Sequence, residues 1–439
     1  MRRVSILALL VLSLFLCCLA REPAEAKVTI TLCARDWPPE LEWTYDVIAE
    51  FERQNPDIQV DIIIYSSSGT ARWEKLSLLF AAGNAPDVWG HGGPVKSMDT
   101  LGWLSDLRPF IERDRAELNI GDFFPVAWKA YQAEGRQWGL PMNSVGTFVV
   151  YNPDVFAEAG LAFPPTSWDN ASWNYTTMIQ AAKRLTKVNH DGTVNRFGLQ
   201  FGTLEYDALM WAWLHGGDWF DAETYRTGVI KKINLTDAVT VNAYEEIVNL
   251  RNQRIIPGGA PWESPPVSNS ILEGKVAMRI IAGWGLSDYV NYAGGTNWSL
   301  AALPKFQTRA NLIYTDPWVM SSVTQHPEEA WRLIKFLVSG TVMESYVRRM
   351  SFLPARLSAA YSYASVLSEQ TNLSQAKVLE VLGGAQEHGR ECIDHTLHGY
   401  QTVIPILNPI LNNIYAQNVS ARQGLETAEA MINAALRKR

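Results

Sequence analysis

The stretch VTITLCARDWPPELEWTYDVIAEFERQNPDIQVDIIIY, residues 28–65, decides the fold. Its apolar pattern predicts a strand over residues 28–32, a helix over 40–54 and a second strand over 58–65. The helix is expected to end at Asn55, which precedes a proline. Strands that are joined through a helix pair in parallel by a right-handed crossover, so this stretch predicts the first unit of an α/β fold.

The alternation continues beyond residue 65. A second helix is predicted over 71–82, ended by Gly83, and a short third strand over 87–89. We therefore expect a largely parallel sheet, and such sheets bind ligands beyond the carboxyl ends of their strands. That rule selects three segments as the expected ligand loops: residues 33–43, 66–73 and 89–94.

A second α/β region follows. Its predicted strands cover residues 147–151, 197–201, 276–281 and 299–303, and its predicted helices 171–185, 207–214, 238–252 and 327–338. Residues 373–436 are expected to be mostly helical. Because no internal repeat, low-complexity tract or long linker interrupts the chain, we expect two α/β lobes in close contact.

Composition limits the classes of function. The chain has 439 residues, of which 47% are hydrophobic and 19% charged, as expected for a globular protein of two or three domains. Its formal net charge of −7 argues against a nucleic-acid partner. Seventeen tryptophans stand beside only four cysteines and seven histidines.

The N-terminus has the pattern of a signal peptide. Two arginines precede an apolar run over residues 4–20, and Ala24 and Ala26 supply the small residues of a cleavage site. We expect residues 1–26 to be a secretory signal peptide and the protein to be exported, periplasmic or extracellular. A cell-surface lipoprotein anchored at Cys17 or Cys18 is the alternative, although Phe15-Leu16 fits that signal poorly.

The remaining cysteines raise two questions. An oxidising compartment permits a disulfide between Cys33 and Cys392, but sequence alone does not show whether they pair. Four zinc or copper ligand types fall close together at His388, Cys392, His395 and His398. Since Gly389 and Gly399 weaken the helix that would align them, we predict neither a metal nor a cofactor.

Several motifs occur in order between Asn55 and Ser339: NPDIQV (55–60), AAGNAPDV (81–88), GWLSDL (102–107), GLP (139–141), YNPDVF (151–156), GKVAM (274–278), GW (283–284), LP (303–304) and EEAWRLIKFLVS (328–339). Together they resemble the extracellular solute-binding proteins of ABC importers, in the sugar-binding branch that includes the maltodextrin receptors. Ile271 departs from this pattern, because the family usually has an aromatic residue there, and no motif is recognisable beyond Gly340.

The resemblance implies an α/β, two-lobed, periplasmic-binding-protein-like fold with a hinge and an interlobe ligand cleft. We expect an N-lobe over residues 27–141 and 310–384 and a C-lobe over 142–309 and 385–439. It also implies a monomeric receptor, not an enzyme, that captures a sugar or oligosaccharide and delivers it to the membrane permease of an ABC importer. In this family the region around His388 lies close to the cleft, so its polar side chains are alternatively expected to face ligand.

Tryptophans suit a sugar cleft for a physical reason. Indole surface covers the apolar face of a pyranose, while carboxylates, amides and imidazoles bond to its hydroxyls. Trp284 and Asp36 resemble positions at which the family contacts sugar. Trp318 follows Asp316-Pro317, and the other candidates follow strand ends or lie in the ligand loops. The full set of predicted ligand-binding residues is Trp284, Trp37, Asp36, Trp318, Trp89, His91, Trp43, Glu205 and Tyr206.

Each candidate has a structural alternative. Trp43 is predicted to lie opposite a buried helix face formed by Leu41, Tyr45, Ile48 and Phe51, and is otherwise a packing residue. Asp36 is otherwise a turn or capping residue, and the remaining aromatic candidates would otherwise be packed in the interior. Three further residues are predicted to be structural: Asp87, Trp211 and Trp213.

Two other functions remain open. An exported glycoside hydrolase also lines its cleft with tryptophan, but needs two carboxylates about 5–9.5 Å apart, and no acidic pair has a recognisable catalytic context. A receptor for a polyol, glycerol phosphate or a peptide is the second alternative. A phosphate ligand would favour an arginine in the cleft. Arg72 and Arg136 are candidates for that arginine, so this alternative remains open.

Overall fold

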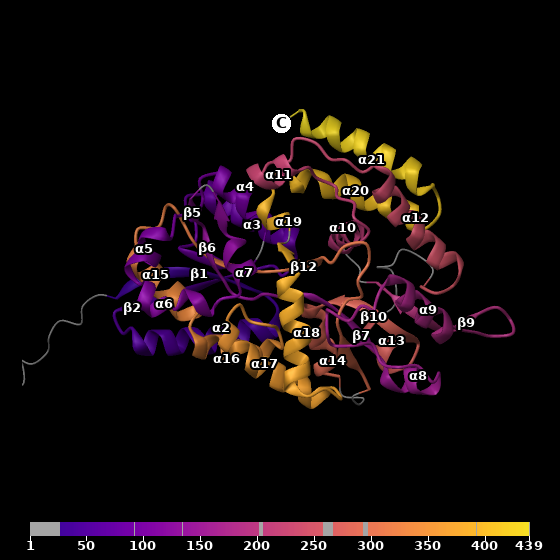
Figure 1. The fold of residues 1–439 in the computed structure, drawn as a ribbon. Coiled ribbons are helices and arrows are strands. Elements are labelled where there is room, and N and C mark those ends of the chain that lie inside the picture. The colour runs from indigo at the N-terminus through magenta and orange to yellow at the C-terminus, as the bar shows by residue number, and fades with distance from the viewer. Residues whose placement is uncertain are drawn as a thin grey trace, which may run out of the picture.

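The computed structural model describes residues 27–91, 93–133, 135–201, 205–257, 267–292, 297–391 and 393–438. The predicted signal peptide and Cys392 lie outside these residues. Two five-stranded sheets and many helices make up the described chain, which confirms the expected α/β class (Figure 1). None of the described helices is long and apolar enough to span a bilayer.

The first sheet has the strand order β2-β1-β3-β13-β6. β1 (Val28–Arg35) pairs in parallel with β2 (Ile58–Tyr65) along its whole length and with β3 (Val88–Gly90). β13 (Pro317–Met320) returns from far along the chain and pairs antiparallel with both β3 and β6 (Gly139–Pro141). The largely parallel sheet is therefore confirmed, since four of its strands run in one direction, and β13 is the exception.

Helix α2 (Pro38–Gln54) buries Ile48 and Phe51 as predicted, but the rest of its buried face differs from the prediction. Trp43 is 4% exposed, whereas Tyr45 is 50% exposed. The cause is α16 (Gly340–Met350), which covers this side of α2 and was not predicted. The Trp43 indole donates from Nε1 to Ser345 Oγ over 2.9 Å and meets the Tyr346 ring edge-on.

The second sheet has the strand order β11-β7-β10-β9-β8. β7 (Thr147–Tyr151) pairs antiparallel with β10 (Val276–Ala282) and β11 (Ser299–Ala301), and every residue of β7 and β10 is buried. β9 (Val194–Gln200) pairs in parallel with β10 and antiparallel with β8 (Lys187–Val188). Complete burial of the central strands requires cover on both faces of the sheet.

Helices supply that cover. α9 (Tyr175–Leu185) begins four residues later than predicted, because the Asn174 side chain caps it by accepting from Thr177 N. α10 (Glu205–Leu214) and α12 (Ala238–Asn252) follow, the latter with the predicted bounds. The C-terminal pair α20 (Tyr400–Tyr415) and α21 (Ala421–Leu436) packs on α12.

The other described elements are α3 (Gly69–Ala81), α4 (Val95–Thr100), α5 (Arg108–Arg113), α6 (Arg115–Leu118), α7 (Pro125–Lys129), β4 (Gln132–Ala133), β5 (Arg136–Gln137), α8 (Pro153–Glu158), α11 (Ala222–Thr227), α13 (Val267–Leu272), α14 (Leu286–Val290), α15 (Pro327–Leu337), α17 (Leu357–Gln370) and α19 (Ile393–Thr396).

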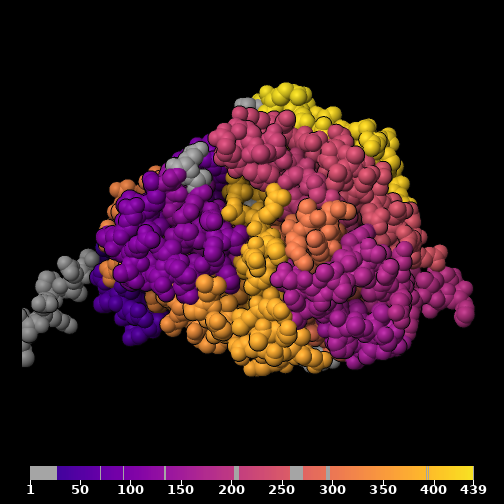
Figure 2. All heavy atoms as spheres, viewed as in Figure 1, coloured from indigo at the N-terminus to yellow at the C-terminus, as the bar shows by residue number. Residues whose placement is uncertain are grey.

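Three stretches of chain run between the two sheets and bond to one another: residues 142–146, 302–316 and 386–391. β12 (Asn311–Ile313) pairs in parallel with β14 (Gly389–Glu391). The Ser144 hydroxyl donates to Gln386 Oε1 over 2.6 Å, and Gln386 Nε2 donates back to the Ser144 carbonyl over 3.0 Å. Helix α18 (Gln375–Glu387) brings Gln386 to this junction and is seen in the middle of the space-filling view (Figure 2).

Candidate ligand-binding site

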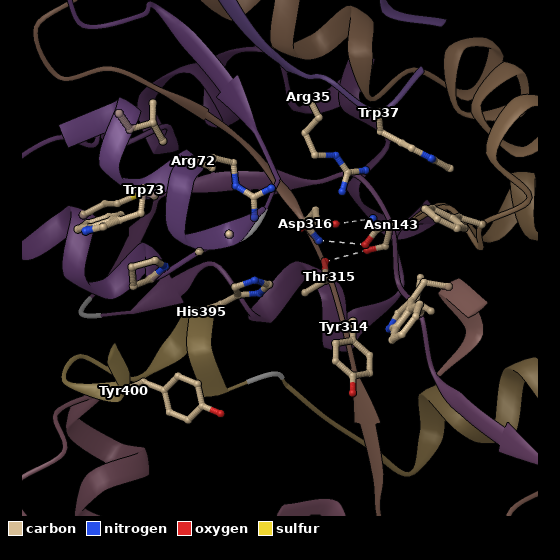
Figure 3. A pocket seen from close by; sticks show the side chains of 18 of the residues that line it. Arg35, Trp37, Arg72, Trp73, Asn143, Tyr314, Thr315, Asp316, His395 and Tyr400 are labelled. Carbon is tan, nitrogen blue, oxygen red and sulfur yellow. Dashed lines mark hydrogen bonds between the residues drawn. The ribbon is translucent and has the colours of Figure 1, made fainter. Parts of the chain in front are cut away.

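A pocket of about 700 Å³ lies where the first sheet, the crossing stretches and the second sheet meet. All three predicted ligand loops contribute to it, with Trp37, Trp73 and Pro94 among the lining residues. The opposite wall comes from Trp284, after β10, and from Tyr400, at the start of α20. The pocket is thus built by segments far apart in the sequence (Figure 3).

Aromatic rings form its apolar walls. Trp37 stacks on Phe352 with 5.8 Å between ring centroids and an angle of 11° between planes. Trp73 stacks on Trp103 at 5.1 Å and 29°. Trp284 is 36% exposed, whereas most of the other described tryptophans are buried. These rings provide the flat surfaces that the C–H face of a pyranose requires.

A buried ion pair lies behind the pocket wall. Arg35, at the end of β1, donates from Nε to Glu40 Oε2 over 2.8 Å, and Glu40 also bonds to His91 Nε2. Burial raises the pKa of Glu40, but the contacts with His91 and Arg35 outweigh it and hold that pKa below its usual value. Burial lowers the pKa of His91, and Arg35 adds to this effect, so the ring is neutral near pH 7.

Two carboxyl groups line the pocket. Asp316 accepts from Asn143 Nδ2 over 2.9 Å. Burial raises the pKa of Asp316, but the Arg35 charge and the Asn143 amide outweigh it and hold that pKa well below its usual value. Partial burial raises the pKa of Asp288, with Arg279 opposing the shift. The pocket therefore presents an ionised acceptor at Asp316 opposite the donors of its arginines.

Arg72 is the second arginine of the lining. Its Nη1 atom is buried and has no hydrogen-bond partner among the described residues. Its guanidinium lies over the Tyr65 ring, 5.9 Å from the centroid. Arg136, the other arginine considered for an anion, bonds instead to Asp99 over 2.6 Å and does not line the pocket.

Of the nine predicted ligand residues, the structure places Trp37 and Trp284 at the pocket. Asp36 does not line it: its Oδ1 accepts from Ser67 N over 2.7 Å, which is the turn role given as its alternative. Trp43 lies under α16, as described above. The side chains of Glu205 and Tyr206 lie outside the described part of the structure.

The other three candidates lie behind the pocket wall. Trp89 is 1% exposed on β3 and meets the Phe80 ring edge-on. Trp318, on β13, fills the space beside Gly90, where an added Cβ would come within 2.6 Å of its ring. His91 is 3% exposed and reaches the site only through Glu40 and Asp316. Trp89 and His91 were expected at a strand end that faces ligand, and Trp318 after Asp316-Pro317, but all three side chains are buried.

Several lining residues were missed by the sequence prediction. Trp73 ends the predicted loop 66–73, so its position carried the signal although the residue was not singled out. Asn143, Thr315 and Asp316 come from the crossing stretches, which have no recognisable local pattern. Asp87, Trp211 and Trp213 are confirmed as structural residues: Asp87 accepts from Thr31 Oγ1, and both tryptophans are buried.

The three histidines near the C-terminus have different neighbours and do not form one cluster. His395 lines the pocket, His398 Nδ1 lies 3.0 Å from Ser97 Oγ, and His388 packs near Trp168. In the part of the chain that the structure describes, no group of three metal-ligating side chains comes together. Cys392 is outside that part, and the Cys33 thiol is buried and free.

Comparison with known proteins gives a family match. The sequence profile described as "Bacterial extracellular solute-binding protein" matches residues 37–342. A protein of Brucella abortus (strain 2308) named only as a binding protein is 23% identical over 83% of this chain and 86% of its own length. The maltotriose-binding protein of Pyrococcus abyssi (strain GE5 / Orsay) is 21% identical over 80% of this chain and 70% of its own. The structure of the sugar-binding protein MalE from Xanthomonas citri is similar with a TM-score of 0.76 and 20% identity, over 94% of this chain and 98% of the other, which shows a shared fold.

Proposed function

Because the chain belongs to the family of bacterial extracellular solute-binding proteins, we propose that it captures a carbohydrate between two lobes and delivers it to the membrane permease of an ABC importer. The observation that carries this proposal is the pocket lining. Tryptophans that stack on other rings line the walls of the pocket, and guanidinium, amide and carboxylate groups lie between them. Flat apolar surfaces beside convergent donors and acceptors match a pyranose, which has an apolar face and a polar rim.

The charges of the lining favour a neutral ligand. Arg35 and Arg72 are balanced by Asp288 and Asp316, and Arg35 is further neutralised by Glu40 behind it. An anion such as glycerol phosphate would meet the two carboxyl groups as well as the arginines. A neutral polyhydroxylated molecule can instead accept from the guanidinium groups and donate to the carboxylates. The sugar names of the Pyrococcus and Xanthomonas relatives agree with this assignment.

Binding would act by a shift in population. A ligand that contacts both lobes only when they are closed favours the closed form, which a permease can recognise. We retain the division into an N-lobe over 27–141 and 310–384 and a C-lobe over 142–309 and 385–439. The first sheet falls within the former and the second sheet within the latter, which supports this division. The proposal includes export to the periplasm or cell exterior and a monomeric state.

A glycoside hydrolase is the alternative that one observation favours. Asp288, with its raised pKa, and Asp316, with its lowered pKa, have the unequal environments of an acid and a base. The Asp316 carboxylate, however, is already bound by the Asn143 amide, and the matched family consists of binding proteins. No bond need be made or broken for the proposed role.

The deciding experiment titrates the purified protein with mono- and oligosaccharides and with glycerol phosphate while tryptophan fluorescence is followed. Saturable changes with a sugar, and none with glycerol phosphate, are expected. Absence of a response to every sugar would contradict the proposal, and a response to glycerol phosphate alone would favour the anion alternative. Sustained release of reducing sugar that is abolished by Asp288→Asn would establish a hydrolase instead.

A further inference from the structure

The side of the pocket formed by α3 carries a second aromatic platform. We infer that Trp73 is a stacking subsite distinct from the one at Trp37, and that the ligand is an oligosaccharide with at least two pyranose rings. This inference rests on the proposed function and adds to it the length of the carbohydrate.

Trp73 is held as a rigid surface. It is partly buried, lines the pocket, and stacks with Trp103 at a centroid distance of 5.1 Å. Trp103 in turn stacks on Phe80 at 4.3 Å with an angle of 6°, and neither Trp103 nor Phe80 lines the pocket. An indole that is fixed by a stack of rings behind it loses little freedom when a sugar packs against its remaining surface, which is a condition for tight binding.

The two platforms, Trp73 and Trp37, lie apart along the pocket (Figure 3). Figure 3 shows Trp73 on one side and Trp37 on the other, with the side chains of Arg35, Arg72 and Asp316 between them. A single pyranose ring stacked on one platform would leave the other uncovered. The pocket volume of about 700 Å³ is in the range that encloses ligands larger than one sugar ring.

Arg72 supplies the polar contact between the platforms. Its Nη1 group is buried without a hydrogen-bond partner, and no carboxylate of the described residues forms an ion pair with it. Buried donors in folded proteins are nearly always satisfied, so this group marks a place where the ligand accepts. A hydroxyl or linking oxygen of a sugar next to the one stacked on Trp73 would meet this requirement.

The test compares one sugar ring with several. Calorimetric titration would use glucose, maltose, maltotriose, cellobiose and cellotriose with the unaltered protein and with Trp73→Ala, Trp37→Ala and Trp128→Ala. Trp128 is the matched control, because it is also partly buried and packed on a ring, that of Phe123, but lies outside the pocket. Unfolding curves establish that each variant is folded, and Trp73→Leu, which fills the space but has no flat ring, serves if Trp73→Ala is not.

We expect one of the oligosaccharides to bind at least about ten-fold more tightly than glucose. Removal of either platform should weaken that oligosaccharide about ten-fold, while glucose, which occupies one platform, should be weakened by only one of the two substitutions. Trp128→Ala should change neither affinity. Glucose that binds as tightly as every oligosaccharide, or oligosaccharide binding that Trp73→Ala leaves intact, would overturn the inference and leave the proposed function standing. Failure of every sugar to bind would instead overturn the proposed function.

Discussion

Glu40 and Arg35 form an ion pair directly behind the pocket. Arg35 Nε donates to Glu40 Oε2 over 2.8 Å, and only 2% of the Glu40 side chain is exposed. Arg35 reaches the pocket from the end of β1, while Glu40 stands in the first turn of α2. The pair therefore links the first helix of the fold to the orientation of a guanidinium that faces ligand.

Glu40→Gln should destabilise the protein and weaken ligand binding. Loss of one partner of a buried ion pair leaves an uncompensated charge, and we expect the free energy of unfolding to fall by about 3 kcal/mol. Denaturation in urea measures this change. Glu50→Gln is the control, because Glu50 also pairs with an arginine on α2 but is exposed, and little change is expected there. Equal effects of the two substitutions would contradict this role of Glu40.

Stability should fall as pH is lowered from about 7 to 5.5. Burial and Arg35 lower the pKa of His91 from 6.5, so below that pH the unfolded chain binds a proton that the folded protein does not. The contribution is present above the unfolded pKa and is lost as pH falls toward the folded one. Glu40 and Asp316, the carboxylates that face His91, titrate at lower pH because their pKa values are also lowered. Urea denaturation at several pH values measures the slope.

His91→Gln should reduce that slope without abolishing it. Burial also lowers the pKa of His215, which is remote from the pocket lining and supplies the remaining dependence on pH. A slope that is the same in His91→Gln and in the unaltered protein would show that His91 does not change protonation on unfolding.

Trp284→Ala should weaken sugar binding about ten-fold and leave the free energy of unfolding within about 0.5 kcal/mol, because this indole is 36% exposed at the pocket. Trp298→Ala provides the contrast. Trp298 is 1% exposed, and its removal should cost about 3–5 kcal/mol of stability. Fluorescence titration and urea denaturation measure the two effects, and unchanged affinity in Trp284→Ala would remove this residue from the site.

Gln386→Ala should loosen the junction between the sheets. Ser144 would lose both the acceptor of its hydroxyl and the donor to its carbonyl, at a cost of about 1–3 kcal/mol. Gln325→Ala is the control, since Gln325 is exposed and bonds only to the nearby Val323 carbonyl. Small-angle scattering should show a wider mean opening for Gln386→Ala alone, and identical curves would count against a hinge role.

The Cys33 thiol should resist alkylation in the folded protein. Burial raises its pKa to about 12, so almost no thiolate is present at pH 8, and the side chain is inaccessible. Treatment with iodoacetamide followed by peptide mapping should find Cys33 unmodified until denaturant is added. Rapid labelling without denaturant would contradict this placement.

Much of the fold was predictable because local patterns determine it. The strand Ile58–Tyr65 and the helix Ala238–Asn252 have the predicted bounds, since Pro56 and the Asp237 cap mark their starts. The full buried face of α2 was not predictable from α2 itself. Trp43 is buried by α16, and only tertiary structure brings that helix beside it.

The site was predictable in outline but not in detail. The rule for strand ends identified the loops that carry Trp37, Arg72 and Trp73. It did not show that Trp89 turns into the core, because in a short strand one residue of register separates the interior from the pocket. Asp316 is brought to the site by a strand that returns antiparallel across the chain, a pairing that no local pattern encodes.

The stretches that cross between the sheets are also a wall of the pocket, through Asn143, Val145, Tyr314, Thr315 and Asp316. A bound ligand would thus contact the stretches about which the two lobes would rotate. In a rotation, a displacement of a fraction of an ångström beside the axis increases with distance from the axis. It is therefore largest at the outer edges of the two lobes. The surfaces farthest from the ligand are then displaced most when the ligand binds.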